Sequence, residues 1–184
     1  GVRRASDDDP RWMLTRAPEE LPRPRSLERL IRERLRALEP TERIWLERLC
    51  VVGGRIEPGF LMAAFPPTKR VEIDEVLARL VRKGWLVPAA DRYRFERPAL
   101  REALYRALPV ARARRLHAAA AEGLRAQPED LEEAYQRAFH LHAARTYPEL
   151  LETVSAILAP LRRRASAQHL ATLARWALEA LEHL

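Results

Sequence analysis

The spacing of hydrophobic residues changes from a helical to an alternating pattern in one short stretch of this chain, residues 85–95. Residues 85–87 are apolar, residues 89–91 favour a turn, and residues 93–95 alternate between outward and inward positions, as in a strand. Elsewhere apolar residues recur at helical spacing, and no strand pattern follows Pro128. We therefore expect a mainly α-helical protein with one small β-hairpin.

Prolines and glycines divide the residues before this hairpin into predicted helices. Ser26 and Thr41 are expected to cap the first two helices, which Pro40 and Gly53 end. The four helices are predicted over about residues 27–39, 41–52, 58–65 and 71–83. The first 25 residues are expected to form an extended lead-in, because they contain Asp7, Asp8 and Asp9 and then Pro10, Pro18, Pro22 and Pro24.

The order of these elements favours two domains. Helices followed by a two-stranded wing are typical of a winged-helix domain, here about residues 26–108, which includes a helix from about residue 98. Pro109 fits the first position of a linking helix over residues 109–126.

Residues 127–184 are predicted to form an α-helical hairpin array that resembles tetratricopeptide repeats. Its helices are expected at about residues 129–145, 148–158 and 167–184, separated by Pro148 and Pro160. The helix-pair period is close to the roughly 34 residues of that repeat. Because such arrays need about three repeats for stability, we expect this part to pack on the winged helix or to continue beyond residue 184.

The composition is that of a foldable protein with a dispersed positive charge. The chain has 33 Lys and Arg against 26 Asp and Glu, a net charge of +7, but most predicted helices carry both signs. The longest uncharged stretch, residues 58–68, has 11 residues and three prolines, whereas a membrane span needs about 20 apolar residues. We expect no membrane span, no secretory signal and a cytoplasmic location, and the single Cys50 excludes an internal disulfide.

No residue pattern indicates catalysis, a metal site or a cofactor within this chain. Residues 51–55 follow a helix instead of introducing one, which favours a helix end over a phosphate-binding loop. His140 and His142 are two residues apart on one helix, about 200° around its axis, and cannot converge on one ion. Cys50 is expected to be a buried packing residue, and His117 a packing or surface residue.

The alternative of an autonomous DNA-binding regulator depends on the helix over residues 71–83. In a DNA-reading winged helix this element would enter the major groove, but it begins with Glu72, Asp74 and Glu75. Carboxylates there oppose phosphate contact, which supplies most of the affinity for DNA. The basic residues that would contact phosphates in this alternative are Arg79, Arg82, Lys83, Arg92 and Arg94.

Two strings resemble bacterial STAND-class signal-transduction ATPases. The string SLERLIRERLRALEPTERIWLERLCVVGG resembles the junction between their nucleotide-binding core and winged helix. The string LARLVRKGWLVPAADRYRFERPALREALYRAL, followed by RARRLHAAAAEGL, resembles the end of their winged helix and the helix that leads into tetratricopeptide-like repeats. The resemblance covers roughly residues 11–145 and depends on order and spacing, not on a catalytic signature.

The resemblance implies a non-catalytic coupling arm of a larger ATPase with a LuxR-type transcription-factor, kinase or cyclase output. ATP or ADP would bind an upstream core, and a protein partner would bind the helical repeat. In the family a histidine commonly lies two residues after the aromatic residue of the wing strand and faces the nucleotide. Here that position, two after Phe95, is Arg97, which the resemblance makes a candidate nucleotide sensor. A structural adaptor whose ATPase part has decayed is a third interpretation.

Overall fold

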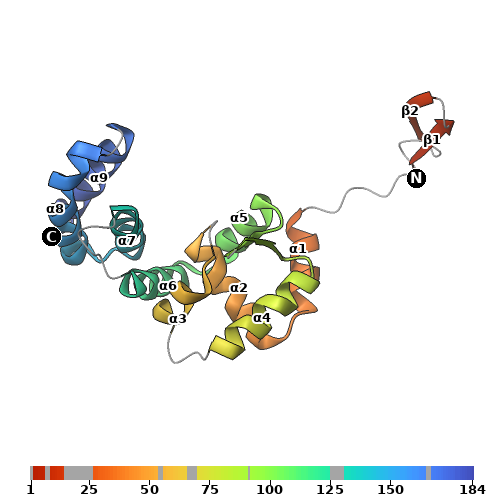
Figure 1. Cartoon of the computed structure of the whole chain (residues 1–184), viewed down its shortest axis with the longest axis horizontal. Helices are drawn as coiled ribbons and strands as arrows, with labels where there is room; N and C mark the ends of the chain where they lie inside the picture. The colour runs from red at the N-terminus through yellow and green to blue at the C-terminus, as the bar shows by residue number, and fades with distance from the viewer. Residues whose placement is uncertain are drawn as a thin grey trace. The chain divides into compact units, whose positions relative to one another are not determined.

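The computed structural model describes residues 2–6, 9–14, 27–53, 56–65, 70–90, 92–124, 131–164 and 167–184 (Figure 1). The chain forms two units, Gly1–Arg36 and Ala37–Leu184. The boundary between the units, after Arg36, falls within the residues 26–108 predicted to form a winged-helix domain.

The first unit contains an antiparallel hairpin and one helix. Strands β1 (Val2–Ser6) and β2 (Asp9–Leu14) pair with Val2 opposite Leu14, and Pro10 lies near the start of β2. The backbone of these two segments is extended, as expected, but their pairing into a hairpin was not predicted. An edge strand tolerates a proline because not every backbone N–H in it donates to the neighbouring strand. Helix α1 (Leu27–Arg36) ends four residues before Pro40. The predicted cap Ser26 and Pro18, Pro22 and Pro24 lie outside the described residues.

The second unit begins with three helices and a hairpin. These are α2 (Pro40–Val52), α3 (Pro58–Ala64), α4 (Arg70–Arg82), β3 (Leu86–Ala89) and β4 (Arg92–Phe95). Leu86 pairs with Phe95 across the hairpin, which confirms the small antiparallel sheet predicted from the change of spacing. Between α2 and α3, Ile56 forms an antiparallel bridge with Tyr93, with both N–H···O distances 2.9 Å.

The start of α2 corrects one predicted cap. Glu39 occupies the N-cap position and Pro40 the first helical position, so Thr41 lies inside the helix. The Glu39 N–H donates to the Glu42 carboxylate at 2.9 Å, which satisfies a backbone donor that the helix leaves open. Glu42 is fully buried, whereas Ile44 is 39% exposed.

The core of this part is built from aliphatic residues together with the aromatic residues Trp45, Phe65, Trp85 and Phe95. Gly84, with φ of +67°, ends α4 and turns the chain so that Trp85 enters the core at 1% exposure. The largest other fully buried side chains here are Leu46, Leu49, Ile56, Leu61, Ile73, Leu77, Leu80 and Leu86.

Five helices complete the chain: α5 (Pro98–Ala107), α6 (Val110–Gly123), α7 (Leu131–Ala144), α8 (Tyr147–Arg164) and α9 (Ala167–Leu181). Pro109 is the N-cap of α6, one residue before its predicted position. The predicted end of the eighth helix before Pro160 is wrong, because α8 continues to Arg164. A proline removes one backbone hydrogen bond, and the long packed face that precedes it, with Leu150, Val154 and Ile157 buried, holds the helix.

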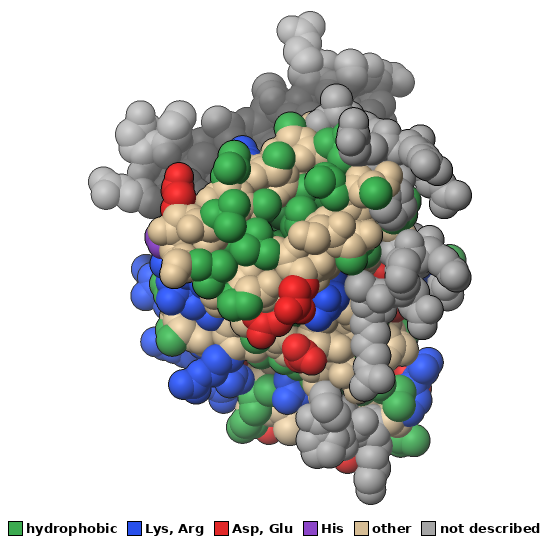
Figure 2. Space-filling view, turned by 90° about the vertical axis from the view of Figure 1, so that its left-hand side faces the viewer, with side chains coloured by type: hydrophobic (Ala, Val, Ile, Leu, Met, Phe, Trp, Pro, Cys, Tyr) green, Lys and Arg blue, Asp and Glu red, His purple; other side chains and the backbone are tan. Residues whose placement is uncertain are grey.

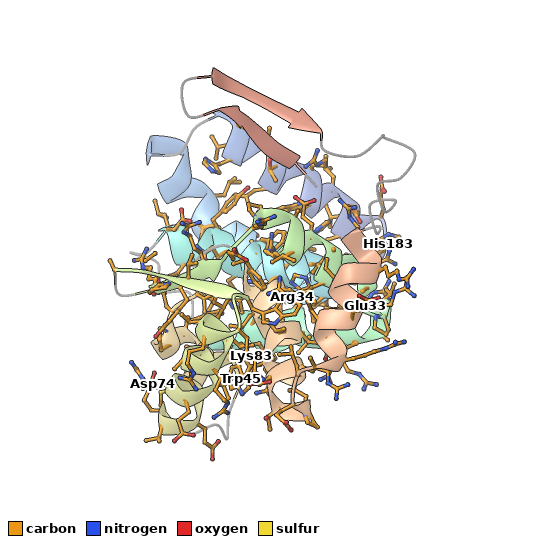
Figure 3. The ribbon with its side chains drawn as sticks, turned by 90° about the vertical axis from the view of Figure 1, so that its right-hand side faces the viewer. Glu33, Arg34, Trp45, Asp74, Lys83 and His183 are labelled. Atoms are coloured by element: carbon orange, nitrogen blue, oxygen red, sulfur yellow. The ribbon has the colours of Figure 1, made fainter. Side chains whose placement is uncertain are left out.

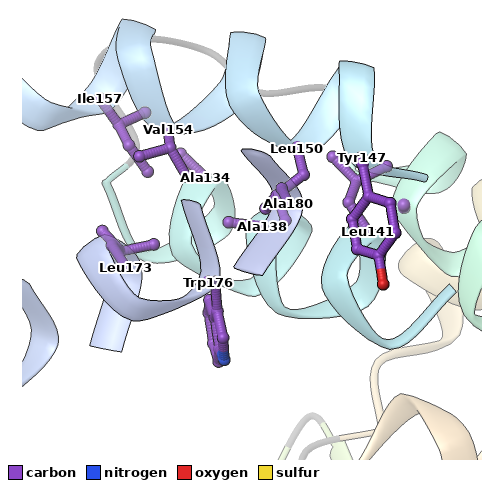
Figure 4. Packing of buried hydrophobic residues seen from close by; sticks show 11 residues of the cluster. Ala134, Ala138, Leu141, Tyr147, Leu150, Val154, Ile157, Leu173, Trp176 and Ala180 are labelled. Atoms are coloured by element: carbon purple, nitrogen blue, oxygen red, sulfur yellow. The ribbon is translucent and has the colours of Figure 1, made fainter. Parts of the chain in front are cut away.

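The last helices share one hydrophobic core (Figure 4). Leu141 of α7, Leu150 and Val154 of α8, and Leu173 and Trp176 of α9 interdigitate there. The alanines Ala134, Ala138 and Ala180 are fully buried in the same core, and their small side chains allow the helix backbones to approach closely. No helix among the described residues is long and apolar enough to cross a membrane.

Candidate functional site

Helix α6 lies at the junction between the part with the hairpin and the last three helices. It packs against α2 and α3 on one side and against α7 on the other. At its C-terminal end Gly123 approaches α3 so closely that an added Cβ would lie 2.6 Å from the Ala64 Cα. Only glycine fits this contact, so Gly123 allows the end of α6 to pack closely on α3.

A buried chain of polar side chains joins three helices across this junction. The Tyr105 hydroxyl of α5 lies 2.9 Å from His117 Nε2 of α6, and His117 Nδ1 lies 2.8 Å from His140 Nδ1 of α7. His117 is 1% exposed and His140 is 2% exposed. The Phe139 ring packs edge-on against His117, with ring centroids 5.6 Å apart. The two imidazoles therefore interact in a dry environment.

Both histidines are held neutral by their surroundings. Burial, together with the charge of the nearby Arg101 guanidinium, lowers the pKa of His117 to about 4. Burial lowers the pKa of His140 to about 3, together with the charges of His117 and Arg101. In a neutral pair one Nδ1–H donates to the other Nδ1, so the contact between α6 and α7 depends on a single shared proton.

Two arginines connect α5 and α6 to α2. Arg101 Nε of α5 donates to the Cys50 carbonyl oxygen in the last turn of α2 at 3.0 Å. Arg112 Nε of α6 lies 3.1 Å from the Glu47 carboxylate. The Cys50 side chain is fully buried, and burial raises the pKa of its thiol to about 12, which confirms it as a packing residue.

The buried Glu42 carboxylate connects α2 to the end of α4 through two partly exposed basic side chains. Lys83 Nζ lies 2.7 Å from Glu42 Oε2, and Arg79 Nε lies 3.6 Å from Glu42 Oε1. Burial raises the pKa of Glu42, but the hydrogen bonds from Lys83 and the Glu39 N–H and the charge of Arg79 outweigh it, so the pKa is lowered. Figure 3 labels Lys83 and also Asp74, which lies near the other end of α4 and pairs with Arg70 at 3.0 Å.

The basic residues predicted to contact phosphates in the DNA-binding alternative differ in their surroundings. Arg79 and Lys83 pair with Glu42, and Arg92 Nε lies 2.9 Å from Glu57 Oε1. The other two, Arg82 and Arg94, are exposed. The candidate nucleotide sensor Arg97 is also exposed, at the N-cap of α5. Three of the five residues predicted to contact phosphates, Arg79, Lys83 and Arg92, thus form ion pairs within the protein.

A cavity of about 330 Å³ lies at the same junction. Phe60 of α3, Arg92 of β4 and Leu124 after α6 form part of its wall. The remaining lining residues are Val52, Glu57, Gly123, Glu132, Glu133 and Gln136. The cavity wall therefore joins residues of α3 and the hairpin to the first turns of α7.

Aromatic side chains line the contact between α7 and α9; we call them the aromatic face, which consists of Tyr135, Phe139, His142, His169 and Trp176. Trp176 stacks on His142, with centroids 5.1 Å apart, and packs on Tyr135 at 5.7 Å. His142 Nε2 lies 2.9 Å from a Glu179 carboxylate oxygen, and Phe139 is 38% exposed. The aromatic face is therefore held in place by ring contacts and is partly exposed.

Sequence reasoning missed the His117–His140 contact. The two residues are 23 positions apart and lie on different helices, so no helical spacing relates them. His140 and His142 have different partners, His117 and Glu179. No group of three or more His, Cys, Asp or Glu that could hold a metal ion occurs among the residues that the structure places.

Comparison of the chain with protein-family models, curated proteins and solved structures finds no match. The functional interpretation therefore depends on the geometry above and on the resemblance of the two sequence strings.

Proposed function

We propose that this chain is a non-catalytic coupling module, in which a winged helix and a tetratricopeptide-like array transmit the state of a bound protein partner to a nucleotide-binding core. The observation that carries the proposal is the buried junction at α6. This helix packs simultaneously on α2, α3 and α7, and Tyr105, His117 and His140 join α5, α6 and α7. A displacement of α7 therefore changes the His140–His117 contact with α6 and, through His117, the contact of α6 with Tyr105 of α5.

The order of elements supports the winged helix. Helix α2, the extended bridge at Ile56, helices α3 and α4, and the β3–β4 hairpin follow each other in the order of that fold. Ile56 pairs with Tyr93 and thereby adds a third extended segment beside the hairpin, which belongs to the usual winged-helix sheet. On this interpretation the domain begins with α2, not at residue 26.

The last helices support a tetratricopeptide-like array. Helices α7, α8 and α9 follow each other through short connections, and α8 packs on both neighbours. Leu131 and Ala167, the first residues of α7 and α9, are 36 positions apart, close to the period of about 34. The aromatic face between α7 and α9 is the surface where we place the partner.

The mechanism is a population shift between two packed arrangements. A partner on the aromatic face changes how α7 and α9 pack, and α6 passes this change to α2, α3 and α5. The ATP or ADP of the upstream core, the cytoplasmic setting and the sensor role of Arg97 enter through the resemblance to STAND-class ATPases. The exposure of Arg97 leaves its guanidinium accessible to such a core.

Hydrogen exchange of the full chain tests the coupling. Leu173→Ala removes a fully buried α9 side chain, and such truncations cost about 2–5 kcal/mol. If the junction couples the two parts, amides of α2 and α5 lose protection together with those of α9. Leu178→Ala is the matched control, because Leu178 lies on the same helix and is 63% exposed. Unchanged protection in α2 and α5 in the Leu173→Ala variant would show independent parts and refute the coupling.

The alternative of an autonomous DNA-binding regulator is tested by fluorescence anisotropy with labelled mixed-sequence duplex. We expect no sequence preference, and weak binding that disappears at about 0.15 M salt, where screening limits charge effects to roughly 8 Å. Specific binding that persists at this salt concentration, and that weakens in an Arg82→Ala variant, would favour the DNA-binding alternative.

A further inference from the structure

Arg48 of α2 lies half-buried against two aromatic rings. Its guanidinium carbon is 4.6 Å from the centre of the ring of Trp45, which Figure 3 labels, and 5.2 Å from the centre of the Phe65 ring at the end of α3. The two rings meet edge to face, with centroids 6.2 Å apart. A guanidinium that stacks on an aromatic ring keeps its in-plane N–H groups available, and these can bind a carboxylate with two parallel hydrogen bonds.

Within the residues that the structure describes, the charge of Arg48 has no anionic partner. Arg48 forms no hydrogen bond or ion pair with any of them, and the adjacent Glu47 carboxylate instead lies 3.1 Å from Nε of Arg112. Burial and the charge of Arg112 lower the pKa of the Arg48 guanidinium, and the charge of Glu47 does not compensate. Charges withdrawn from water are normally paired, whereas these two guanidinium groups share one carboxylate and leave one positive charge in excess.

Exposed apolar side chains lie one helical turn from Arg48 and from Phe65. Ile44 precedes Arg48 by four residues on α2 and is 39% exposed. Met62 precedes Phe65 by three residues on α3 and is 37% exposed. Residues three or four apart lie on the same side of a helix, so each apolar side chain neighbours the stacked group. We call Ile44, Arg48, Met62 and Arg112 the Arg48 surface.

We propose that the Arg48 surface binds an acidic segment of a protein partner. An Asp or Glu carboxylate of this segment binds the Arg48 guanidinium, close to the positive charge of Arg112, and the neighbouring apolar side chains of the segment pack on Ile44 and Met62. The segment thereby supplies the counter-charge that Arg48 does not find among the described residues, and it removes apolar side chains from water.

The balance of charges favours a carboxylate over a phosphate. One excess positive charge matches a single carboxylate, whereas a phosphate dianion or a nucleic-acid strand would bring further negative charge against Glu47 and leave Ile44 and Met62 uncovered. Figure 2 shows hydrophobic side chains gathered on the side of the molecule where α8 and α9 lie. The Arg48 surface differs from that side because its charge specifies the chemistry of the partner. The inference is independent of the proposed function, because the Arg48 surface shares no residue with the aromatic face.

The first experiment selects binders from a phage-displayed library of random linear peptides on the immobilised full chain. We expect peptides in which an Asp or Glu stands beside apolar residues, with an affinity at least about tenfold lower for the Arg48→Gln chain. Circular dichroism checks that this variant remains folded. Arg175→Gln is the matched control, because it removes the same charge from an exposed position of α9, and it should bind like wild type. Selected peptides that lack acidic residues, or that bind the Arg48→Gln chain as tightly, would overturn the proposal.

Substitutions in the peptide test the contact without altering the protein. Replacing the acidic residue of a selected peptide by its amide should weaken binding to wild type about tenfold, but binding to the Arg48→Gln chain less than about twofold, because that chain has no guanidinium there for the carboxylate. Equal losses with both chains would place the carboxylate elsewhere and overturn the proposal. Inorganic phosphate and chloride at equal ionic strength should displace the peptide equally. Stronger displacement by phosphate would assign Arg48 to a phosphate ligand and likewise overturn the proposal.

Discussion

We expect the folded chain to lose free energy of unfolding steeply in mild acid, because of the buried His117–His140 pair. Unfolded histidines have a pKa of about 6.5, whereas burial lowers the pKa of His117 to about 4 and that of His140 to about 3. The unfolded chain therefore binds two protons that the folded chain does not bind between pH 6.5 and the folded pKa values. Stability is complete above pH 6.5 and falls as the pH decreases.

The magnitude follows from linkage. Each pKa unit corresponds to about 1.4 kcal/mol, so lowering the pH from 6.5 to 5 costs about 2 kcal/mol per histidine and about 4 kcal/mol for the pair. This is a large part of the 5–15 kcal/mol by which a typical domain is stable. The window lies above the range where Glu42, whose pKa is lowered from 4.5, begins to be protonated.

Urea denaturation followed by circular dichroism, at half-unit steps between pH 7 and pH 5, measures this loss. The matched control is the double variant His117→Phe with His140→Leu, which removes both partners of the Nδ1–Nδ1 contact together, so that neither imidazole is left unpaired. Its free energy of unfolding should lose about 4 kcal/mol less than wild type over the same range. Equal pH dependence in the two proteins would refute the reasoning. Ring-proton titration of wild type by NMR gives a second check, with His117 and His140 silent between pH 8 and pH 5.

Three further predictions concern single positions. Gly123→Ala should destabilise the chain by about 1–3 kcal/mol, because the added Cβ would lie 2.6 Å from the α3 backbone, whereas Gly59→Ala, with nothing within 4 Å, should stabilise it by about 0.5–1 kcal/mol. Arg145→Gly should stabilise by up to about 1 kcal/mol, because Arg145 has a φ of +62° after α7. Lys83→Met should destabilise by about 1–3 kcal/mol at pH 7, since it leaves the fully buried Glu42 carboxylate with a weaker partner. Chemical denaturation of each variant measures these changes, and a neutral Gly123→Ala or Lys83→Met variant would contradict the corresponding contact.

The sequence predicts most elements of the second unit because their signals are local. Trp85 and Phe95 bracket the change from helical to alternating spacing, and the hairpin lies there. The errors occur where packing outweighs a local preference. Pro160 disfavours a helix, yet the buried face of α8 before it keeps the helix continuous. Thr41 is a better N-cap than Glu39, but Pro40 fits the first helical position and Glu42 completes the cap.

The candidate site could not be predicted for a related reason. Glu42 resembles any surface carboxylate in the sequence, and only the fold brings Lys83, 41 residues later, to it. His117 and His140 are likewise joined by tertiary structure alone. Periodicity identifies which faces are apolar, but it does not show which buried polar groups will meet. The basic residues of α4 therefore suggested DNA contacts, although two of them serve an internal carboxylate.

In the coupling function that we propose, the buried polar contacts distinguish α6 from a passive spacer. A purely apolar junction tolerates small sliding of one helix on another, because hydrophobic contact has no direction. The hydrogen bonds that join Tyr105, His117 and His140 do depend on geometry. A shift of α7 by about one ångström would leave buried ring nitrogens without partners. The junction is therefore expected to exist in discrete arrangements, each with its hydrogen bonds satisfied. A partner that binds one arrangement more tightly selects it for α2 and α5 as well, and this selection is what signal coupling requires.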